Sequence, residues 1–282
     1  MKRCIVVIPA YNEEMSIAKV IAKVPRTLSS RRFTSSVGSA DRAAEEWKVE
    51  ILVVNDGSKD ETSAAAEAAG ADYIYSSTRN RGLGAAVYFG LKQARRLGAD
   101  AAVMIDADDE YPAEEIPQVV YPIMIGEADY VIGSRFMRKV RGMKLHRRLG
   151  NRVFTWLQSL LLRKRIIDGQ SGFRAFHRDA LQDLDIIHDY NYAQVMTLNL
   201  VRQGYRLLEV PISYKTRTTG ESFIKWNYVA KVLPAMVREM MTPPNRGREA
   251  QPSYRLEMRK RAQGKGGSAA TQTDKAIAHL RY

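Results

Sequence analysis

Short apolar runs alternate along the chain with longer amphipathic segments. The runs at residues 5–8 and 51–54 consist of branched apolar side chains only, which is typical of strands that are covered on both faces of a parallel sheet. The pattern predicts strands at 3–8, 50–54, 72–75, 101–105, 129–132 and 207–210, and helices at 13–24, 60–69, 83–97, 114–125, 146–162 and 191–203. This alternation favours one α/β core, a Rossmann-like, mostly parallel sheet with helices on both faces.

Three segments differ from this core. Residues 28–48 are rich in Ser and Arg, which predicts an exposed insertion with a short helix around 41–47. A last helix, about 223–241, has a broader apolar surface than a soluble helix needs, and Pro234 predicts a kink in it. We expect residues 1–241 to form one domain and the polar, basic residues 242–282 to be disordered.

The net charge of +13 is concentrated in one segment. Between residues 130 and 167 the chain has eleven Lys and Arg and no Asp or Glu, and the same segment holds the apolar run 153–162 with Trp156. A basic, Trp-bearing helix suits an anionic membrane surface. Two alternatives are that the basic side chains form a solvated face, or that the apolar side chains pack on the sheet. The helix at 223–241 could likewise lie on a membrane or on a membrane-protein partner. No RNA-binding signature is present, so we expect no nucleic-acid partner.

Other compositional features limit the class of protein. The single Cys4 lies inside the first strand, which excludes a disulfide framework. No signal peptide and no run of about 18 apolar residues is present, so we expect no transmembrane helix. This favours a cytoplasmic protein that meets a membrane from the side.

Polar residues that can carry chemistry follow the predicted strands. Asp106 and Asp108 come directly after the strand at 101–105, where ligands of open α/β sheets bind. Two carboxylates at this spacing can share a divalent cation, and Mg²⁺ or Mn²⁺ is the expected cofactor. Asn12 is expected to cap the first helix, and Gly82 lies where backbone N–H groups could approach a phosphate.

Six motifs occur in the order found in family 2 glycosyltransferases, and the set most resembles the dolichyl-phosphate mannosyltransferase or polyprenyl-phosphate branch. The resemblance covers roughly residues 3–230 and implies a GT-A-type fold, that of nucleotide-diphospho-sugar transferases. The motifs are VIPAYNE at 7–13, VNDGSKDET at 54–62, NRGLG at 80–84, DAD at 106–108, GSRF at 133–136 and SGFR at 171–174.

The resemblance implies a nucleotide-sugar pocket and a metal site. Asp106, Asp108 and Glu110 would hold the cation. Asp56 and Glu13 can accept hydrogen bonds from a base or a ribose, although Asp56 could instead only cap its own turn. The full nucleotide-sugar set is Pro9, Ala10, Tyr11, Glu13, Asp56, Gly82, Asp106, Ala107 and Asp108.

Arginines in matching motifs would neutralise the charge of the departing diphosphate, because guanidinium binds phosphate in a bidentate manner. By resemblance the catalytic arginines are Arg135, Arg174 and Arg217, and the acceptor-phosphate set is Ser134, Arg135, Ser171, Arg174, Arg217 and Lys225. The segment after Arg217 departs from the family, since Phe223 stands where a lysine is usual. Lys225, two residues later, is the candidate replacement.

The expected activity is metal-dependent, anomer-inverting transfer of a hexose from a GDP-mannose or UDP-glucose type donor to a polyprenyl or dolichyl phosphate. The reaction would occur at the cytosolic face of the plasma membrane. A phosphate acceptor needs no base, whereas a hydroxyl acceptor would need one. Asp168 is the candidate base, with a loop-shaping role favoured over it. The alternatives are transfer to a glycan, a protein or a soluble hydroxyl acceptor, or a sugar-nucleotide-binding adaptor without turnover.

Overall fold

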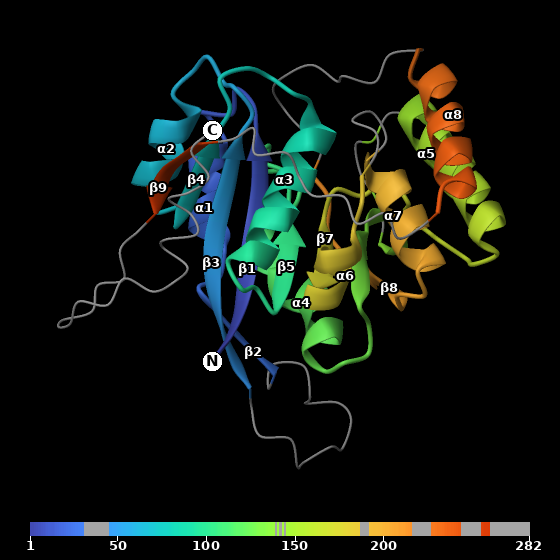
Figure 1. The fold of residues 1–282 in the computed structure, drawn as a ribbon, viewed down its shortest axis with the longest axis horizontal. Coiled ribbons are helices and arrows are strands. Elements are labelled where there is room, and N and C mark those ends of the chain that lie inside the picture. Colours follow the sequence, from blue (N-terminus) through green and yellow to red (C-terminus); the bar gives the residue numbers. More distant parts are fainter. Residues whose placement is uncertain are drawn as a thin grey trace.

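The computed structural model describes residues 1–30, 45–138, 140, 143, 145–186, 192–215, 227–243 and 255–259. A twisted mixed sheet lies at the centre with helices on both faces (Figure 1). Its strand order is β8-β6-β7-β5-β1-β3-β4-β9, and β2 pairs with β3 outside this path. The parallel strands are β1 (Lys2–Ala10), β3 (Glu46–Asn55), β4 (Tyr73–Ser76), β5 (Ala101–Met104), β6 (Tyr130–Ser134) and β8 (Leu207–Pro211). The antiparallel strands are β2 (Thr27–Ser29), β7 (Arg174–His177) and β9 (Arg255–Arg259).

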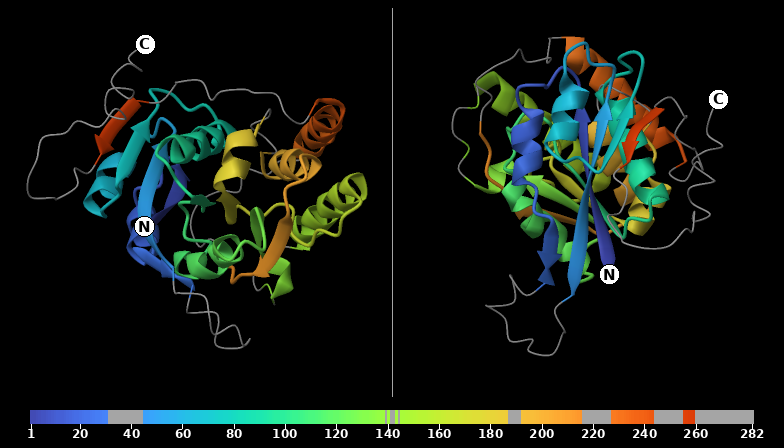
Figure 2. Two further views of the ribbon diagram at one scale, coloured as in Figure 1. Left: turned by 60° about the horizontal axis from the view of Figure 1, so that its bottom comes forward. Right: turned by 90° about the vertical axis from the view of Figure 1, so that its left-hand side faces the viewer.

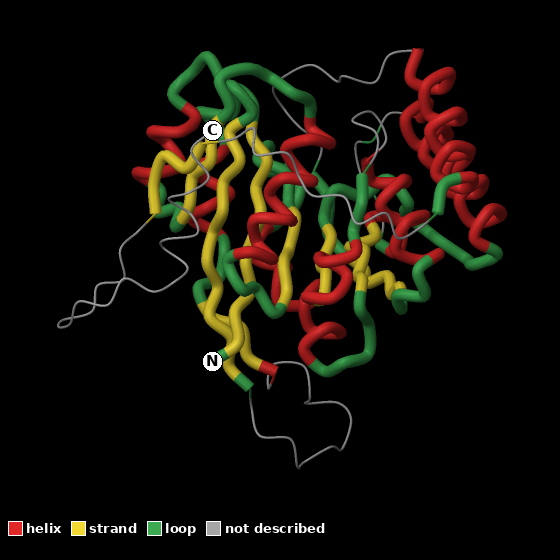
Figure 3. The backbone as a smooth tube through the Cα atoms, viewed as in Figure 1, coloured by secondary structure: helices red, strands yellow, loops and turns green. Residues whose placement is uncertain are grey.

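Helices cover the two faces of this sheet in separate groups (Figures 2 and 3). Successive side chains of β1 point to opposite faces, so Val6 and Ile8 belong to one core cluster and Ile5 and Val7 to the other. The first cluster is closed by α1 (Ile17–Lys23), α2 (Thr62–Ala68) and α4 (Ile116–Met124), the last preceded by a 3₁₀ turn, η2 (Ala113–Glu115). The second is closed by α3 (Leu83–Arg96), α6 (Arg178–Asp183) and α7 (Tyr192–Arg202).

Two further helices lie at one end of the sheet and share a small core with α7. These are α5 (Leu145–Leu162) and α8 (Asn227–Met241). Phe154 of α5, Leu198 of α7, and Val232 and Met236 of α8 form that core. Trp156, in contrast, is 65% exposed, so the apolar residues of the basic segment divide between the core and the surface. Among the described residues, no helix combines the length and the hydropathy needed to cross a membrane.

Both ends of the expected insertion at residues 28–48 belong to the sheet. Leu28 of β2 lies opposite Trp47 of β3, and both side chains are buried. The predicted helix at 41–47 is therefore wrong at its end, where residues 46–47 are strand, and residues 31–44 lie outside the described part. The apolar positions 47, 49 and 51 alternate with polar ones, which is the period of a strand with one covered face.

The other end of the chain also differs from expectation. Five residues of the segment 242–282 form β9, antiparallel to β4, so the prediction of disorder is wrong for them. The first helix begins after Ser16 rather than Asn12. Asn12 has a φ of 55° and takes part in a contact between two loops instead.

Candidate active site

The strands β1, β3, β5 and β6 run in one direction and end at the same edge of the sheet. Ala10 at the end of β1 lies beside Asn55 at the end of β3, and Val7 lies beside Met104 of β5. The residues that follow these strands therefore meet at that edge, as the sequence predicted. They include Tyr11, Asp56, Asp106 and Arg135.

The loops after β1 and β3 hold each other in place. The Asn12 backbone N–H donates to Ser58 Oγ at 2.9 Å, and Asn12 Oδ1 accepts from the Lys59 N–H at 2.9 Å. The Glu13 N–H donates to Thr62 Oγ1 at 2.9 Å. Pro9 and Ala10 are buried, whereas Tyr11 and Glu13 are partly exposed on this fixed loop, and Ser16 Oγ donates to the Glu13 carboxylate.

Asp56 organises a third loop. Its buried carboxylate accepts the Arg81 N–H at 3.0 Å and the Gly82 N–H at 2.8 Å. Gly57, with a φ of +73°, allows close approach, because a Cβ there would lie 2.5 Å from the Arg79 carbonyl carbon. The Gly82 N–H that we expected to approach a phosphate is directed at Asp56. Asp56 thus shapes its surroundings, and its contact with a nucleotide stays a prediction.

A cluster of carboxylates surrounds the end of β5. Asp106 Oδ1 is buried and has no hydrogen-bond partner among the described residues. Burial, followed by the neighbouring charges of Asp108, Glu110 and Glu13, raises the pKa of Asp106 well above the usual range of an aspartate. Gly172 packs on this carboxylate so closely that a Cβ on it would lie 2.3 Å from Asp106 Oδ2.

This cluster fits a divalent cation. Crowded carboxylates with an unsatisfied oxygen are stabilised by a hard cation, for which oxygen ligands are preferred. Glu110 is buried, and its Oε2 accepts from the Tyr214 hydroxyl at 2.8 Å. Within the described ranges no three such side chains are already arranged around a single point, so a ligand or a donor phosphate would have to complete the shell.

The Arg135 side chain places a positive charge near this carboxylate cluster. It is 3% exposed, and its charge acts against the pKa rise of Asp106. Its Nε and Nη2 each lie 2.7 Å from the carboxylate of Asp168, and its backbone N–H donates to the same group at 2.9 Å. The Tyr214 ring packs 5.4 Å from the guanidinium. The described residues leave Nη1 without a hydrogen-bond partner, so Arg135 can offer that nitrogen to a phosphate.

Glu209 of β8 fixes the segment that carries Asp168. Its Oε2 accepts the Ile167 N–H at 2.7 Å and its Oε1 accepts the Asp168 N–H at 2.8 Å. Asp168 itself is fully buried, and Arg135 occupies both of its oxygens. This arrangement supports the loop-shaping role expected for Asp168 rather than a base role.

The structure places Arg174 differently from expectation. Arg174 is fully buried, and it donates to the Gly169, Ser171 and Ala193 carbonyl oxygens and to Thr197 Oγ1, all at 2.7 to 2.8 Å. Arg174 pairs with Met104 and Ile132 and so lies at the same edge of the sheet, but its hydrogen bonds to Ala193 and Thr197 direct the guanidinium into the core beside α7. The structure therefore does not place Arg174 where it could contact a phosphate, and the prediction of such a contact is wrong.

The two serines are buried as well. Ser171 Oγ accepts the Phe173 N–H at 3.3 Å, whereas Ser134 Oγ has no partner among the described residues. Arg217 and Lys225, together with Phe223, lie outside the described part of the chain.

Sequence reasoning missed three residues that build the site. Gly172 belongs to a recognised motif, but its contact with Asp106 joins residues 66 positions apart. Tyr111 accepts the Gly172 N–H at 3.0 Å and so fixes that contact. Glu209 could have been identified from the sequence, because it is an acidic residue inside an otherwise apolar predicted strand.

Comparisons with known proteins identify related chains. The sequence profile described as Glycosyl transferase family 2 matches residues 5–185. The undecaprenyl-phosphate mannosyltransferase of Micrococcus luteus is 30% identical over 84% of this chain and 93% of its own. The dolichyl-phosphate hexose transferase of Haloferax volcanii is 31% identical over 77% of this chain and 84% of its own.

Solved structures show a similar fold. Glucosyl-3-phosphoglycerate synthase from Mycobacterium tuberculosis, in complex with Mn²⁺, uridine diphosphate and glucosyl-3-phosphoglycerate, superposes with a TM-score of 0.63. The two chains are 22% identical, and the match covers 86% of this chain and 81% of the other. At this identity the likeness supports the fold alone.

Proposed function

The chain belongs to glycosyltransferase family 2 and has the GT-A fold, and on this premise we propose that it transfers a hexose from a nucleotide sugar to a polyprenyl phosphate. The donor would be of the GDP-mannose or UDP-glucose type, and the acceptor dolichyl or another polyprenyl phosphate. The relatives named for transfer to lipid phosphates match most of the chain and support this acceptor class.

The observation that carries the proposal is the carboxylate cluster beside Arg135. The buried Asp106 oxygen lacks a donor, and Asp108, Glu110 and Glu13 add negative charge around it. Asp106 and Asp108, with Glu110, would hold Mg²⁺ or Mn²⁺, and Mn²⁺ accompanies uridine diphosphate in the structural relative. When bound, the cation would offset the charge that develops on the departing diphosphate.

The remaining groups would bind and orient the substrates. Tyr11 and Glu13 are partly exposed on the loop after β1, and Glu13 is close enough to Asp106 to raise its pKa; both would contact the nucleoside. Arg135, fixed by Asp168, would direct Nη1 at a phosphate oxygen. Because its position is set before the substrate arrives, it would stabilise the developing charge without reorganisation of the site.

A phosphate monoester acceptor is already anionic at neutral pH, so positioning would be more important than proton removal. No carboxylate is needed as a base, which agrees with the engagement of Asp168 by Arg135. We infer a single displacement with inversion at the anomeric carbon. The acceptor phosphate would attack from the side opposite the diphosphate, and the sugar–diphosphate bond would break as the new bond forms.

Because the acceptor is a lipid and the donor is soluble, the reaction would occur where the protein rests on the cytosolic face of a membrane. The basic segment around α5 would make this peripheral contact, either with anionic lipid or with a membrane-protein partner. This localisation follows from the proposed acceptor and from the exposed side chains of α5.

The test is nucleotide release from a panel of GDP- and UDP-sugars, with Mg²⁺ or Mn²⁺, with and without a polyprenyl phosphate. Release that requires both metal and lipid phosphate is the expected result and would identify the donor. Metal-dependent release that is indifferent to the lipid would refute the acceptor and favour a hydroxyl acceptor. Nucleotide binding without release under any condition would favour an adaptor.

A further inference from the structure

Helix α5 has an apolar stripe that no described residue covers. Leu149, Val153, Trp156 and Leu160 follow one another at intervals of four, three and four residues, which places them on one face of the helix. Their exposed fractions are 62%, 53%, 65% and 58%. The opposite face of α5 packs into the protein through Phe154. The stripe is therefore an outward apolar face rather than a group of isolated exposed residues.

Helix α8 lies at the same end of the molecule as α5 (Figures 1 and 2). Leu233, Val237 and Met241 recur every four residues and are 43%, 50% and 81% exposed. We refer to the exposed apolar residues of the two helices as the α5–α8 surface.

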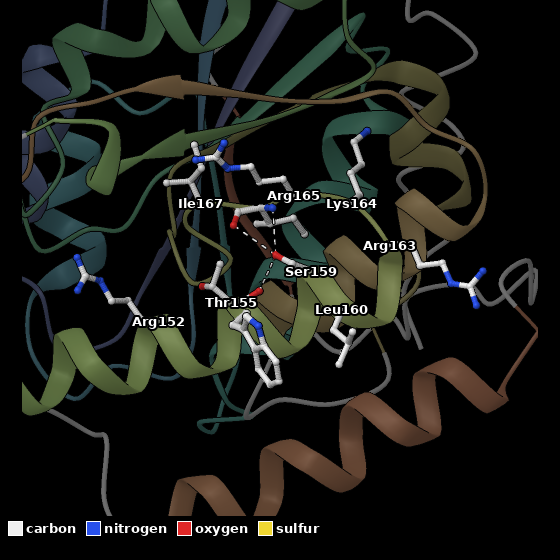
Figure 4. Close-up of a pocket in the computed structure, with 10 residues that line it drawn as sticks. Arg152, Thr155, Ser159, Leu160, Arg163, Lys164, Arg165 and Ile167 are labelled. Carbon is white, nitrogen blue, oxygen red and sulfur yellow. Dashed lines mark hydrogen bonds between the residues drawn. The ribbon is translucent and has the colours of Figure 1, made fainter.

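Positive charge borders this surface. A groove of about 490 Å³ runs along the second half of α5 and the turn that follows it. Arg152, Arg163, Lys164 and Arg165 stand around it, as Figure 4 shows, and Trp156 and Leu160 also line it. All four basic side chains are exposed, and no carboxylate of the described residues pairs with them.

Arg163 has an unfavourable backbone conformation for its residue type. Its φ is 50°, the left-handed conformation that commonly ends a helix and that glycine adopts without cost. An arginine here costs stability that a glycine would not. Arg163 therefore places a positive charge at a position where glycine would give the more stable backbone.

We propose that the α5–α8 surface docks the protein on a membrane surface that contains anionic lipid. Trp156 and Leu160 would enter the boundary between headgroups and acyl chains, and the basic residues around the groove would contact lipid phosphates. A second copy of the chain fits poorly, because two like-charged borders would face each other. The inference deepens the proposed function, since it states how the enzyme would reach a lipid acceptor.

The test is co-sedimentation of the full chain with vesicles of phosphatidylcholine alone or with 30% phosphatidylglycerol. We expect binding to the anionic vesicles in 0.1 M salt and its loss in 1 M salt, where the Debye length falls from about 10 to about 3 Å. Binding equal on both vesicle types, or absent at low salt, would overturn the proposal.

Two substitutions examine the two parts of the surface. Trp156→Ala should weaken vesicle binding by about tenfold, the effect of keeping one large apolar side chain out of the lipid. Arg163→Gly should weaken it by about fivefold, the effect of removing one positive charge. Because glycine suits the backbone at 163, this variant should unfold at the same or a higher urea concentration, so lost binding cannot be attributed to misfolding.

Matched controls replace exposed residues elsewhere. Lys19→Ala removes an exposed charge on α1, and Leu208→Ala shortens an exposed apolar side chain on β8. Both should bind vesicles as the parent does. Equal losses in the controls, or normal binding by Trp156→Ala, would contradict the assigned surface. A dimer in sedimentation velocity that Trp156→Ala dissociates would identify a second copy as the occupant instead.

An activity measurement separates this inference from the proposed function. With a short-chain, water-soluble isoprenyl phosphate, Trp156→Ala and Arg163→Gly should transfer sugar at the parent rate, whereas with acceptor in vesicles they should be slower. Vesicle binding without transfer to either acceptor would refute the proposed function and leave the docking surface standing. Transfer to both acceptors without any vesicle binding would refute the docking surface and leave the proposed function standing.

Discussion

Replacement of Asp168 by Asn tests how Arg135 is held. Asp168 is fully buried, Arg135 is 3% exposed, and three hydrogen bonds of 2.7 to 2.9 Å join them. Asp168→Asn removes the charge that compensates a buried guanidinium and places an amide donor against another donor. Loss of one partner of a buried pair costs about 3–5 kcal/mol, a large part of the ~5–15 kcal/mol that stabilises a typical domain.

The assay is urea unfolding followed by circular dichroism. At ~2–3 kcal/mol per M of urea, a loss of about 3–5 kcal/mol lowers the midpoint by about 1–2.5 M. The matched control is Asp129→Asn, which breaks an equally bidentate pair with Arg206, at 2.8 and 2.9 Å, on an exposed part of the surface. We expect the control midpoint to stay close to that of the parent, because water screens an exposed pair.

Sugar transfer by Asp168→Asn, measured without urea where the variant is folded, should fall at least tenfold because Arg135 is no longer oriented. A midpoint shift no larger than that of Asp129→Asn would refute the claim that this pair is a structural support. An unchanged midpoint combined with abolished transfer would instead identify Asp168 as a base.

Three further outcomes follow from the site and the core. Asp108→Ala should lower transfer at least 100-fold and abolish Mn²⁺ binding in calorimetry with an unchanged circular dichroism spectrum; normal Mn²⁺ binding would contradict the proposed ligand. Gly172→Ala adds a methyl 2.3 Å from Asp106 Oδ2 and should weaken Mn²⁺ binding by about tenfold, whereas equal affinity would show that the loop yields. Burial lowers the pKa of Lys92 to about 8, whereas an ordinary lysine has a pKa of 10.5. Below about pH 8 the folded state holds the buried amine charged, which costs stability. The free energy of unfolding therefore rises as the pH increases from about 8 to 10.5. Relative to Lys92→Met, the parent should therefore gain stability in urea unfolding between pH 7 and pH 10; a constant difference would show that the amine is solvated.

Much of the fold could be predicted from apolar runs. The apolar runs are continuous in β1, β3 and β5, and the shorter runs of β4, β6 and β8 include a Tyr or an acidic residue, yet all six predicted strands occur in the sheet. β7 could not be found this way, because Arg174 and His177 end a four-residue strand. Its place between β5 and β6 depends on pairing with residues more than 40 positions away, which local periodicity does not report.

The site was predictable where it depends on strand ends. Asp106, Tyr11 and Arg135 each follow a recognisable strand, and parallel strands bring their ends together. Whether a charged side chain turns toward the site or the core depends on the pairing and face of its own strand. Arg174 shows this, since a motif places it correctly along the chain, yet its side chain lies on the face of β7 that packs on α7.

The central claim, transfer of a hexose to a lipid phosphate, is tested most directly by product analysis. The protein would be incubated with an α-linked labelled nucleotide sugar, Mn²⁺ and a polyprenyl phosphate, and the organic-phase product examined by mass spectrometry and by NMR at the anomeric carbon. We predict a β-linked sugar phosphate lipid that forms only when both metal and lipid are present. An α-linked product would contradict inversion, and label that never enters the lipid fraction while nucleotide is released would contradict the lipid-phosphate acceptor.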